Sequence, residues 1–181
     1  MRIAGNQGDN VALLRIHHHP DPVLKQVAEP VTSFDDDLRK LAEDMLETMY
    51  AAPGVGLAAP QVGVSRRLIV LDCGPKEQRQ PIVAVNPVIL DGEGSCCEEE
   101  GCLSVPGYYA RVERREKVRV SFQDLDGRER QMEAEGLWSV CFQHEIDHLD
   151  GILFVDHLSP LKKSLFRKKY RKILEQMEEQ L

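Results

Sequence analysis

Apolar residues recur at helical spacing in three stretches of the chain. Over residues 35–50, leucine and methionine recur every three or four positions after a run of three aspartates. This pattern predicts a helix whose amino end is stabilised by acidic side chains. A second helix is predicted over 136–149. A third is predicted over 159–181, where Ser159 is the expected N-cap and Pro160 the expected first residue.

Short β-strands are predicted between the first two helices. Residues 68–71 are apolar and β-branched, and so are residues 82–90, but Asn86-Pro87 interrupts the latter and predicts an edge strand or a bend. Segments 117–123 and 128–133 flank an Asp-Leu-Asp-Gly turn and predict a hairpin. The elements together predict an α+β fold, with small mixed or antiparallel sheets around the second helix, an N-terminal helix and a C-terminal helix.

Length and composition narrow the class of protein. A chain of 181 residues that is 42% hydrophobic and 29% charged is typical of one globular domain over residues 1–181. Residues 1–11 lack an apolar signal core and are expected to form a flexible polar extension. The net charge of −7 argues against binding DNA, and no apolar run approaches the roughly 20 residues of a membrane span. Five cysteines without framework spacing favour a reducing compartment, the cytoplasm.

The segment His-Glu-Ile-Asp-His at residues 144–148 carries the clearest chemistry in the chain. On a helix, residues four apart lie on the same face, so the two imidazoles can bind one metal ion. Glu145 projects beside that ion without being needed as a ligand. A general base that acts on a metal-activated water belongs in this position.

A metal site of this kind needs a further ligand, and the sequence offers several. In the metzincin spacing the third histidine would fall on Phe154, so that spacing fails. The glutamates of the C-terminal helix lie on an end expected to be solvated. Cys102 is the better candidate, with Cys96 and Cys97 as rival thiols. Two histidines and one thiolate leave a fourth position open for water, whereas a structural zinc site would use four protein ligands.

Three other patterns allow more than one interpretation. Residues 54–63 hold three glycines and two alanines, which permit close backbone approach or form a packing turn. Within them, Gln61 can offer an amide donor to a substrate oxygen. The apolar stripe that precedes His144 on its helix face is either core or the wall of a pocket. The three histidines 17–19 point in different directions, which favours surface or packing roles over a shared metal ion.

Three segments together resemble the signature motifs of bacterial peptide deformylases, in that family's order. They are Gly-Val-Gly-Leu-Ala-Ala-Pro-Gln at 54–61, Glu-Gly-Cys-Leu-Ser at 100–104 and Gln-His-Glu-Ile-Asp-His at 143–148. The similarity runs from about Ala12 to the tail, and three motifs are far more specific than His-Glu-x-x-His alone. The helix over 159–181 resembles that of the deformylases typical of Gram-negative bacteria, where it is associated with ribosome docking.

The resemblance implies a cytoplasmic bacterial hydrolase that removes the formyl group from N-formylmethionine at the N-terminus of newly synthesised proteins, releasing formate. It implies one metal ion per chain, Fe²⁺ in the native enzyme with Zn²⁺, Ni²⁺ or Co²⁺ as replacements. The implied ligands are Cys102, His144 and His148. Glu145 would take a proton from the activated water and return it to the leaving amine. The metal, the Gln61 amide and the Leu103 backbone N–H would hold the oxyanion.

The resemblance also implies a binding site for the methionine side chain. The implied substrate-binding residues are Val55, Gly56, Leu57, Glu100, Gly101, Leu137, Val140 and Cys141. A buried Glu100 needs a partner, which by family position is Arg114. Tyr109 departs from the family, because some members carry there an arginine that holds the peptide backbone.

Two other functions fit parts of the sequence. A metallopeptidase that cuts internal peptide bonds would share the metal and Glu145, and a structural zinc domain would fill four ligand positions. The C-terminal helix carries a local basic patch, which is either a solvated face or a surface that contacts the ribosome. Its members are Lys162, Lys163, Arg167, Lys168, Lys169, Arg171 and Lys172.

Overall fold

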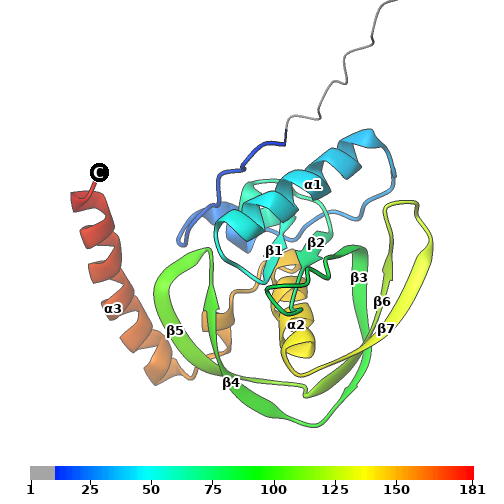
Figure 1. The fold of residues 1–181 in the computed structure, drawn as a ribbon. Helices are drawn as coiled ribbons and strands as arrows, with labels where there is room; N and C mark the ends of the chain where they lie inside the picture. The colour runs from blue at the N-terminus through cyan, green and yellow to red at the C-terminus, as the bar shows by residue number, and fades with distance from the viewer. Residues whose placement is uncertain (1–10) are drawn as a thin grey trace, which may run out of the picture.

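A largely buried helix, α2 (Leu137–Leu149), lies at the centre of the fold, with strands curving around it (Figure 1). The computed structural model describes residues 11–181. The two other α-helices are α1 (Asp36–Ala51) and α3 (Pro160–Glu179). Three short 3-10 helices cover Pro22–Lys25, Ala59–Val62 and Phe154–His157. The three predicted helices are confirmed to within two residues at each end.

The strands form two antiparallel sheets. A five-stranded sheet has the order β1-β2-β3-β6-β7, and a two-stranded sheet pairs β4 with β5. The five strands are Gly56–Ala58, Leu68–Leu71, Ile82–Glu93, Lys117–Gln123 and Glu129–Glu135. The two are Cys96–Cys102 and Val105–Arg114. Every strand pairing is antiparallel, which confirms the α+β class with small sheets around a central helix.

Strand β3 lies in the middle of its sheet, so the predicted edge position of residues 82–90 is wrong, whereas the predicted bend is confirmed. The pairing register shifts around Asn86, whose φ is 49°. The Asn86 side chain accepts from the Val31 N–H at 2.8 Å and donates to the Val31 carbonyl at 2.9 Å, which fixes the bend. Pro87, which has no N–H to donate, falls within this irregular part of the ladder.

Strand β2 separates two parts of the core, because its side chains alternate between its faces. Ile69 and Leu71 pack in one cluster with the buried residues of α2. Leu68 and Val70 pack in a second cluster with those of α1. The two helices therefore cover opposite faces of β2, and the end of this strand lies beside α2.

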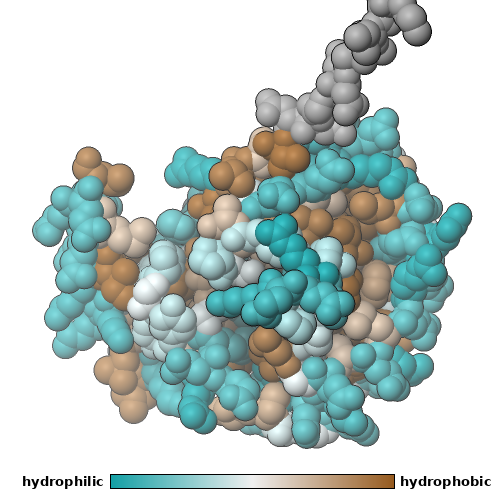
Figure 2. Space-filling model, viewed as in Figure 1, coloured by the Kyte–Doolittle hydropathy of each residue, from teal (hydrophilic) through white to brown (hydrophobic). Residues whose placement is uncertain are grey.

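Helix α3 is attached to the body through a narrow patch. Phe166 and Tyr170 are its buried residues, and their rings lie 5.6 and 5.5 Å from that of His19. Leu161 and Leu165, which recur at helical spacing with the buried residues, are 72% and 57% exposed. Figure 2 shows α3 as largely hydrophilic with separate apolar spots. Within residues 11–181, no helix is both long and apolar enough to cross a membrane.

The N-terminal arm accounts for the histidine run. The His17 ring nitrogen Nδ1 lies 2.7 Å from a carboxylate oxygen of Asp21, and His19 packs against α3, so these two histidines have the predicted surface and packing roles. The predicted flexible extension over residues 1–11 lies outside the described residues, apart from Val11.

Candidate active site

Helix α2 and the end of β4 bring together the three predicted metal ligands. His144 and His148 lie one helical turn apart on α2, and Cys102 is the last residue of β4. The Cys102 Sγ lies 3.3 Å from the His148 Nε2, and one ligand atom from each residue lies within 4.8 Å of the other two. The donors are one sulfur and two imidazole nitrogens, a set suited to Fe²⁺ or Zn²⁺. The residues present therefore fit a metal ion.

A buried carboxylate orients His144. The Glu100 Oε1 lies 2.9 Å from the His144 Nδ1, which leaves the Nε2 free to face the other two ligands. The Arg114 guanidinium donates two hydrogen bonds to Glu100, at 2.9 and 3.0 Å, so the predicted partner is present. Burial alone would raise the pKa of Glu100, but the hydrogen bonds from His144 and Arg114 hold it below its usual range. Such a carboxylate–histidine pair fixes the ring orientation at metal sites.

Arg114 also links the Glu100 carboxylate to polar residues nearer the surface. Arg114 Nη1 donates to an oxygen of Asp147 at 2.6 Å, and the same oxygen lies 2.7 Å from the His157 Nε2. Asp147 belongs to α2 and His157 to the 3-10 helix that follows, so the network, with Glu100 on β4 and Arg114 on β5, ties four elements together around His144. Asp147 and His157 were not predicted to contribute to the site. Their only signal was the position of Asp147 inside the His-Glu-x-x-His segment.

Glu145 lies in a confined space beside the ligand cluster. Its side chain is 5% exposed, and its Oε2 has no hydrogen-bond partner among the described residues. Burial raises the pKa of Glu145 to about 7. Gly56 of β1 makes room for this side chain, because a Cβ at that position would lie 2.5 Å from the Glu145 Oε1. The close approach predicted for the glycine-rich segment is therefore an approach to this carboxylate.

Gln61 is held in one orientation by its neighbours. Its Oε1 accepts from the Ala58 N–H at 2.9 Å, which fixes the amide. Its Nε2 then donates to the Ser104 hydroxyl at 3.0 Å and lies 3.6 Å from the Cys102 sulfur. Gln61 is 1% exposed, so the amide donor is directed at the ligand cluster from a buried position.

An apolar cavity of about 450 Å³ opens beside Glu145. Val55 and Leu137 stand partly exposed in its wall, while Val140 and Cys141 are buried. The residues of the predicted site that line it are Val55, Gly56, Gln61, Glu100, Gly101, Cys102, Leu103, Leu137, Val140, Cys141, His144 and Glu145. The stripe on α2 before His144 is therefore the wall of a pocket.

Leu57 is the predicted substrate-binding residue that the structure places elsewhere. It is fully buried and packs in the core with α1, because all three residues of β1 are covered on both faces. Its side chain does not line the cavity.

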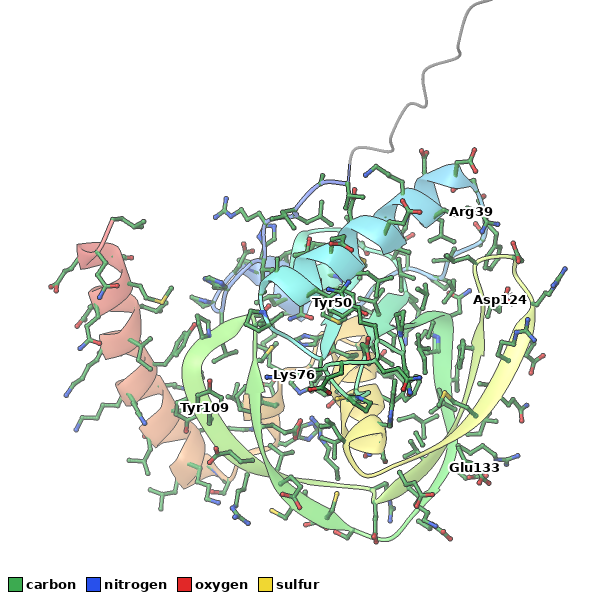
Figure 3. All side chains as sticks on the ribbon, in the orientation of Figure 1. Arg39, Tyr50, Lys76, Tyr109, Asp124 and Glu133 are labelled. Carbon is green, nitrogen blue, oxygen red and sulfur yellow. The ribbon has the colours of Figure 1, made fainter. Side chains whose placement is uncertain are left out.

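Strand β5 supplies pocket residues that were not predicted. Five of its residues line the cavity: Val105, Pro106, Gly107, Tyr108 and Tyr109. The Tyr109 ring, labelled in Figure 3, covers Gly101, where an added Cβ would lie 2.6 Å from it. The available signal for a strand was the alternation of Ala110 and Val112 with the charged Arg111 and Glu113.

Comparisons with known proteins identify the family. Residues 13–164 match the family described as polypeptide deformylase. The chain is 55% identical over 166 residues to the peptide deformylase of Alkalilimnicola ehrlichii, covering 92% of this chain and 93% of that one. It is 54% identical over 162 residues to that of Thermodesulfovibrio yellowstonii, covering 89% and 98%.

Solved structures agree with the sequence relatives. A peptide deformylase from Legionella pneumophila superposes with a TM-score of 0.86 at 49% identity, covering 92% of this chain and 98% of that one. One from Synechococcus elongatus, in complex with actinonin, superposes with a TM-score of 0.81 at 47% identity, covering 86% and 87%. This chain belongs to the peptide deformylase family, metal-dependent hydrolases that remove the formyl group from nascent peptides.

Proposed function

We propose that this chain releases formate from N-formylmethionine at the N-termini of newly made bacterial proteins, with Glu145 as the general base and acid. The observation that carries the proposal is the unpartnered, buried Glu145 Oε2, beside the three-ligand cluster and at the wall of an apolar cavity. The substrate places the activity in the cytoplasm, where nascent chains emerge. Residues 1–181 would act as one catalytic domain.

Cys102, His144 and His148 would hold one metal ion. Fe²⁺ is the proposed native ion, and Zn²⁺, Ni²⁺ or Co²⁺ would replace it because all accept imidazole and thiolate donors. When bound, such an ion lowers the pKa of a water and polarises a carbonyl oxygen. Three protein ligands suit a catalytic site, because they leave a position for water and substrate.

Glu145 would move the proton that the reaction requires. Its carboxylate takes a proton from the water that attacks the formyl carbon, and it then passes this proton to the departing amine nitrogen. The bond that breaks is the formyl C–N bond, and the products are formate and a free amino group. Burial favours the protonated carboxyl group that must hold this proton between the two steps.

Gln61 and the Leu103 backbone would stabilise the oxyanion that forms on the formyl oxygen. The Gln61 amide is already oriented by Ala58, so it would donate with little reorganisation. Leu103 follows Cys102 directly and lines the cavity, so its N–H is close to the same position. Each such donor contributes roughly 3 kcal/mol to the stability of a transition state.

The apolar cavity would receive the methionine side chain of the substrate. Val140 and Cys141 form its buried part, and Val55 and Leu137 stand at its exposed part. An unbranched thioether fills an irregular apolar site of this kind well. The formyl group would then lie between Gln61 and Glu145.

The test is formate release from formyl-Met-Ala-Ser by anaerobically purified, Fe²⁺-loaded protein. Glu145→Ala should retain the metal but lose nearly all activity, whereas Glu98→Ala, at an exposed position on β4, should behave like the parent. Cleavage of an internal peptide bond in an unformylated peptide would favour a metallopeptidase. A folded, metal-loaded parent that releases no formate would refute the proposal.

Helix α3 is the proposed ribosome-contacting surface. It carries seven lysines and arginines between residues 162 and 172 of a protein with a net charge of −7, and it exposes two leucines near its start. Basic residues of this density attract RNA phosphates. In co-sedimentation with bacterial ribosomes, Lys168→Glu with Arg171→Glu should abolish binding that the parent shows at low salt. The matched pair Lys76→Glu with Arg128→Glu should not, and equal loss in both pairs would contradict the assignment.

A further inference from the structure

Cys73 and Cys141 are two free thiols that the catalytic proposal does not use chemically. Cys141 is a buried residue of α2, and Cys73 is partly exposed just beyond the end of β2. Cys73 packs against the apolar cluster to which Cys141 belongs. The other three cysteines lie on β4, including the metal ligand Cys102.

The alternation of side chains along β2 directs Cys73 toward α2. Ile69 and Leu71 face α2, and the next residue of this series is Cys73. Asp72, between them, belongs to the opposite series, and its carboxylate accepts from the hydroxyl of Tyr50 on α1 at 2.6 Å. Cys73 therefore faces the helix that carries Cys141.

The pairing of β1 with β2 sets the height of Cys73 along α2. Gly56 pairs with Leu71 and lies against Glu145, and the Asp72 N–H donates to the Val55 carbonyl at 2.9 Å. From Leu71 to Cys73, the chain therefore runs alongside Val55 and Gly54. Cys141 lies one helical turn before Glu145. The side chains of Cys73 and Cys141 are in hydrogen-bond contact, so the strand and the helix place the two thiols side by side.

The segment around Cys73 is firmly held. The Asp72 carboxylate accepts from the Gly74 N–H at 3.1 Å and from the Gln80 N–H at 3.0 Å, in addition to the Tyr50 hydroxyl. These three hydrogen bonds to one 8%-exposed side chain keep the backbone on both sides of Cys73 in place. The position of the Cys73 thiol is therefore fixed by the fold.

We propose that Cys73 and Cys141 form a redox-sensitive pair, which a hydroperoxide such as hydrogen peroxide converts into a disulfide. Cys73 is the thiol that the oxidant reaches, because it is partly exposed. Hydrogen peroxide oxidises its sulfur to a sulfenic acid and is reduced to one water. The Cys141 sulfur then attacks the Cys73 sulfur, the S–O bond breaks, and the hydroxyl leaves with the Cys141 proton as a second water. Two thiols have then lost two electrons to one peroxide.

The environment of Cys141 fits the second role. The adjacent Cys73 thiol, and then burial, raise the pKa of Cys141 far above its usual range, so it is a poor target for the oxidant itself. In the second step, the short distance between the Cys141 thiol and the Cys73 sulfenic acid compensates for the low reactivity of this thiol.

The disulfide would alter the pocket, a consequence that rests on the proposed function. Cys141 lines the cavity, and bonding to Cys73 ties its sulfur to the side of β2. The methionine side chain then loses one methylene-sized contact, which corresponds to about a fourfold rise in KM with kcat nearly unchanged.

The pair is tested on intact Zn²⁺-loaded protein, whose metal is redox-inert. Protein treated with hydrogen peroxide is denatured, alkylated with N-ethylmaleimide, digested and mapped by mass spectrometry. We expect the peptides containing Cys73 and Cys141 to be joined, two hydrogens lighter than their sum, and to separate after dithiothreitol. Cys73→Ser should abolish this cross-link, while Cys97→Ser, at an exposed position on β4, should retain it.

Two outcomes would overturn the pair. One is that Cys141 is still a free thiol, and is fully alkylated, at a peroxide dose that has already oxidised the exposed Cys97. The other is recovery of Cys73 only as a sulfinic or sulfonic acid. The kinetic effect is read separately, as KM for formyl-Met-Ala-Ser before and after dithiothreitol. A cross-link without a change in KM would refute the effect on the pocket but not the formation of the disulfide. The Cys73→Ser protein should retain parent activity before and after peroxide treatment.

Discussion

Replacing Glu145 by glutamine should stabilise the metal-free protein at neutral and alkaline pH while it removes catalysis. The carboxyl group of Glu145 has an ordinary pKa of 4.5 in the unfolded chain and a pKa of about 7 in the folded protein, where burial disfavours its charge. A raised pKa means that the folded protein binds this proton more tightly than the unfolded chain does. The stability it contributes is fully present below pH 4.5 and is lost as the pH rises to about 7.

The size of the effect follows from the two pKa values. The interval between 4.5 and about 7 corresponds to about 3 kcal/mol, at roughly 1.36 kcal/mol for each pH unit. A small part of this is already expressed at pH 5, so the parent should lose about 2.5 kcal/mol relative to Glu145→Gln between pH 5 and pH 8. Glutamine is neutral at both pH values, and any packing cost it brings is the same at both.

Urea denaturation of chelator-treated protein measures this difference. Trp138, the single tryptophan, lies on α2 and packs against the apolar core, so its fluorescence reports unfolding. The change in unfolding free energy from pH 5 to pH 8 is compared between parent, Glu145→Gln and the exposed control Glu98→Gln. If parent and Glu145→Gln change by the same amount, Glu145 is not the buried carboxyl group with a raised pKa that the geometry indicates.

Three further predictions concern neighbouring residues. Gly56→Ala should displace the Glu145 carboxylate and lower kcat about 100-fold, whereas Glu98→Ala, at an exposed position on β4, should keep parent kcat; equal loss would refute the close-approach argument. Arg114→Met should leave the buried Glu100 without its arginine partner and lower the unfolding free energy by about 3–5 kcal/mol in urea, and a loss below 1 kcal/mol would show that the pair is dispensable. Chelation should abolish formate release and lower Tm, and Fe²⁺ should restore both; activity that survives chelation would exclude the metal.

The helices and the metal cluster were predictable because their signals are local. Asp35 caps α1 through a hydrogen bond to the Leu38 N–H, and Ser159 caps α3, as the sequence indicates. Two histidines four apart meet on any helix, so the pairing of His144 with His148 needs no tertiary information. Cys102 was the better candidate for the third ligand among the thiols, and the family motif assigned it.

The remaining features depend on contacts between distant segments. Leu57 is in the core because α1 and α2 cover β1 on both faces, and its own strand gives no sign of this. In the sequence, Pro87 predicts an edge strand, because proline has no N–H to donate to a neighbouring strand. In the structure, the bend around Asn86 is held by hydrogen bonds to Val31, so no N–H is needed at position 87. Phe166, rather than Leu165, anchors α3 because the histidine and tyrosine rings it meets come from elsewhere in the fold.

The narrow attachment of α3 has a consequence for local opening. Phe166 and Tyr170 are its two buried residues, and Ile173 and Leu174 are partly buried against the same cluster, so unfolding of the turn beyond Leu174 exposes little apolar surface. Backbone amides there should exchange with deuterium orders of magnitude faster than those around Phe142 in α2. Deuterium uptake along α3 would therefore report binding of a partner to this helix. Binding should slow amide exchange beyond Leu174 and leave amide exchange in α2 unchanged.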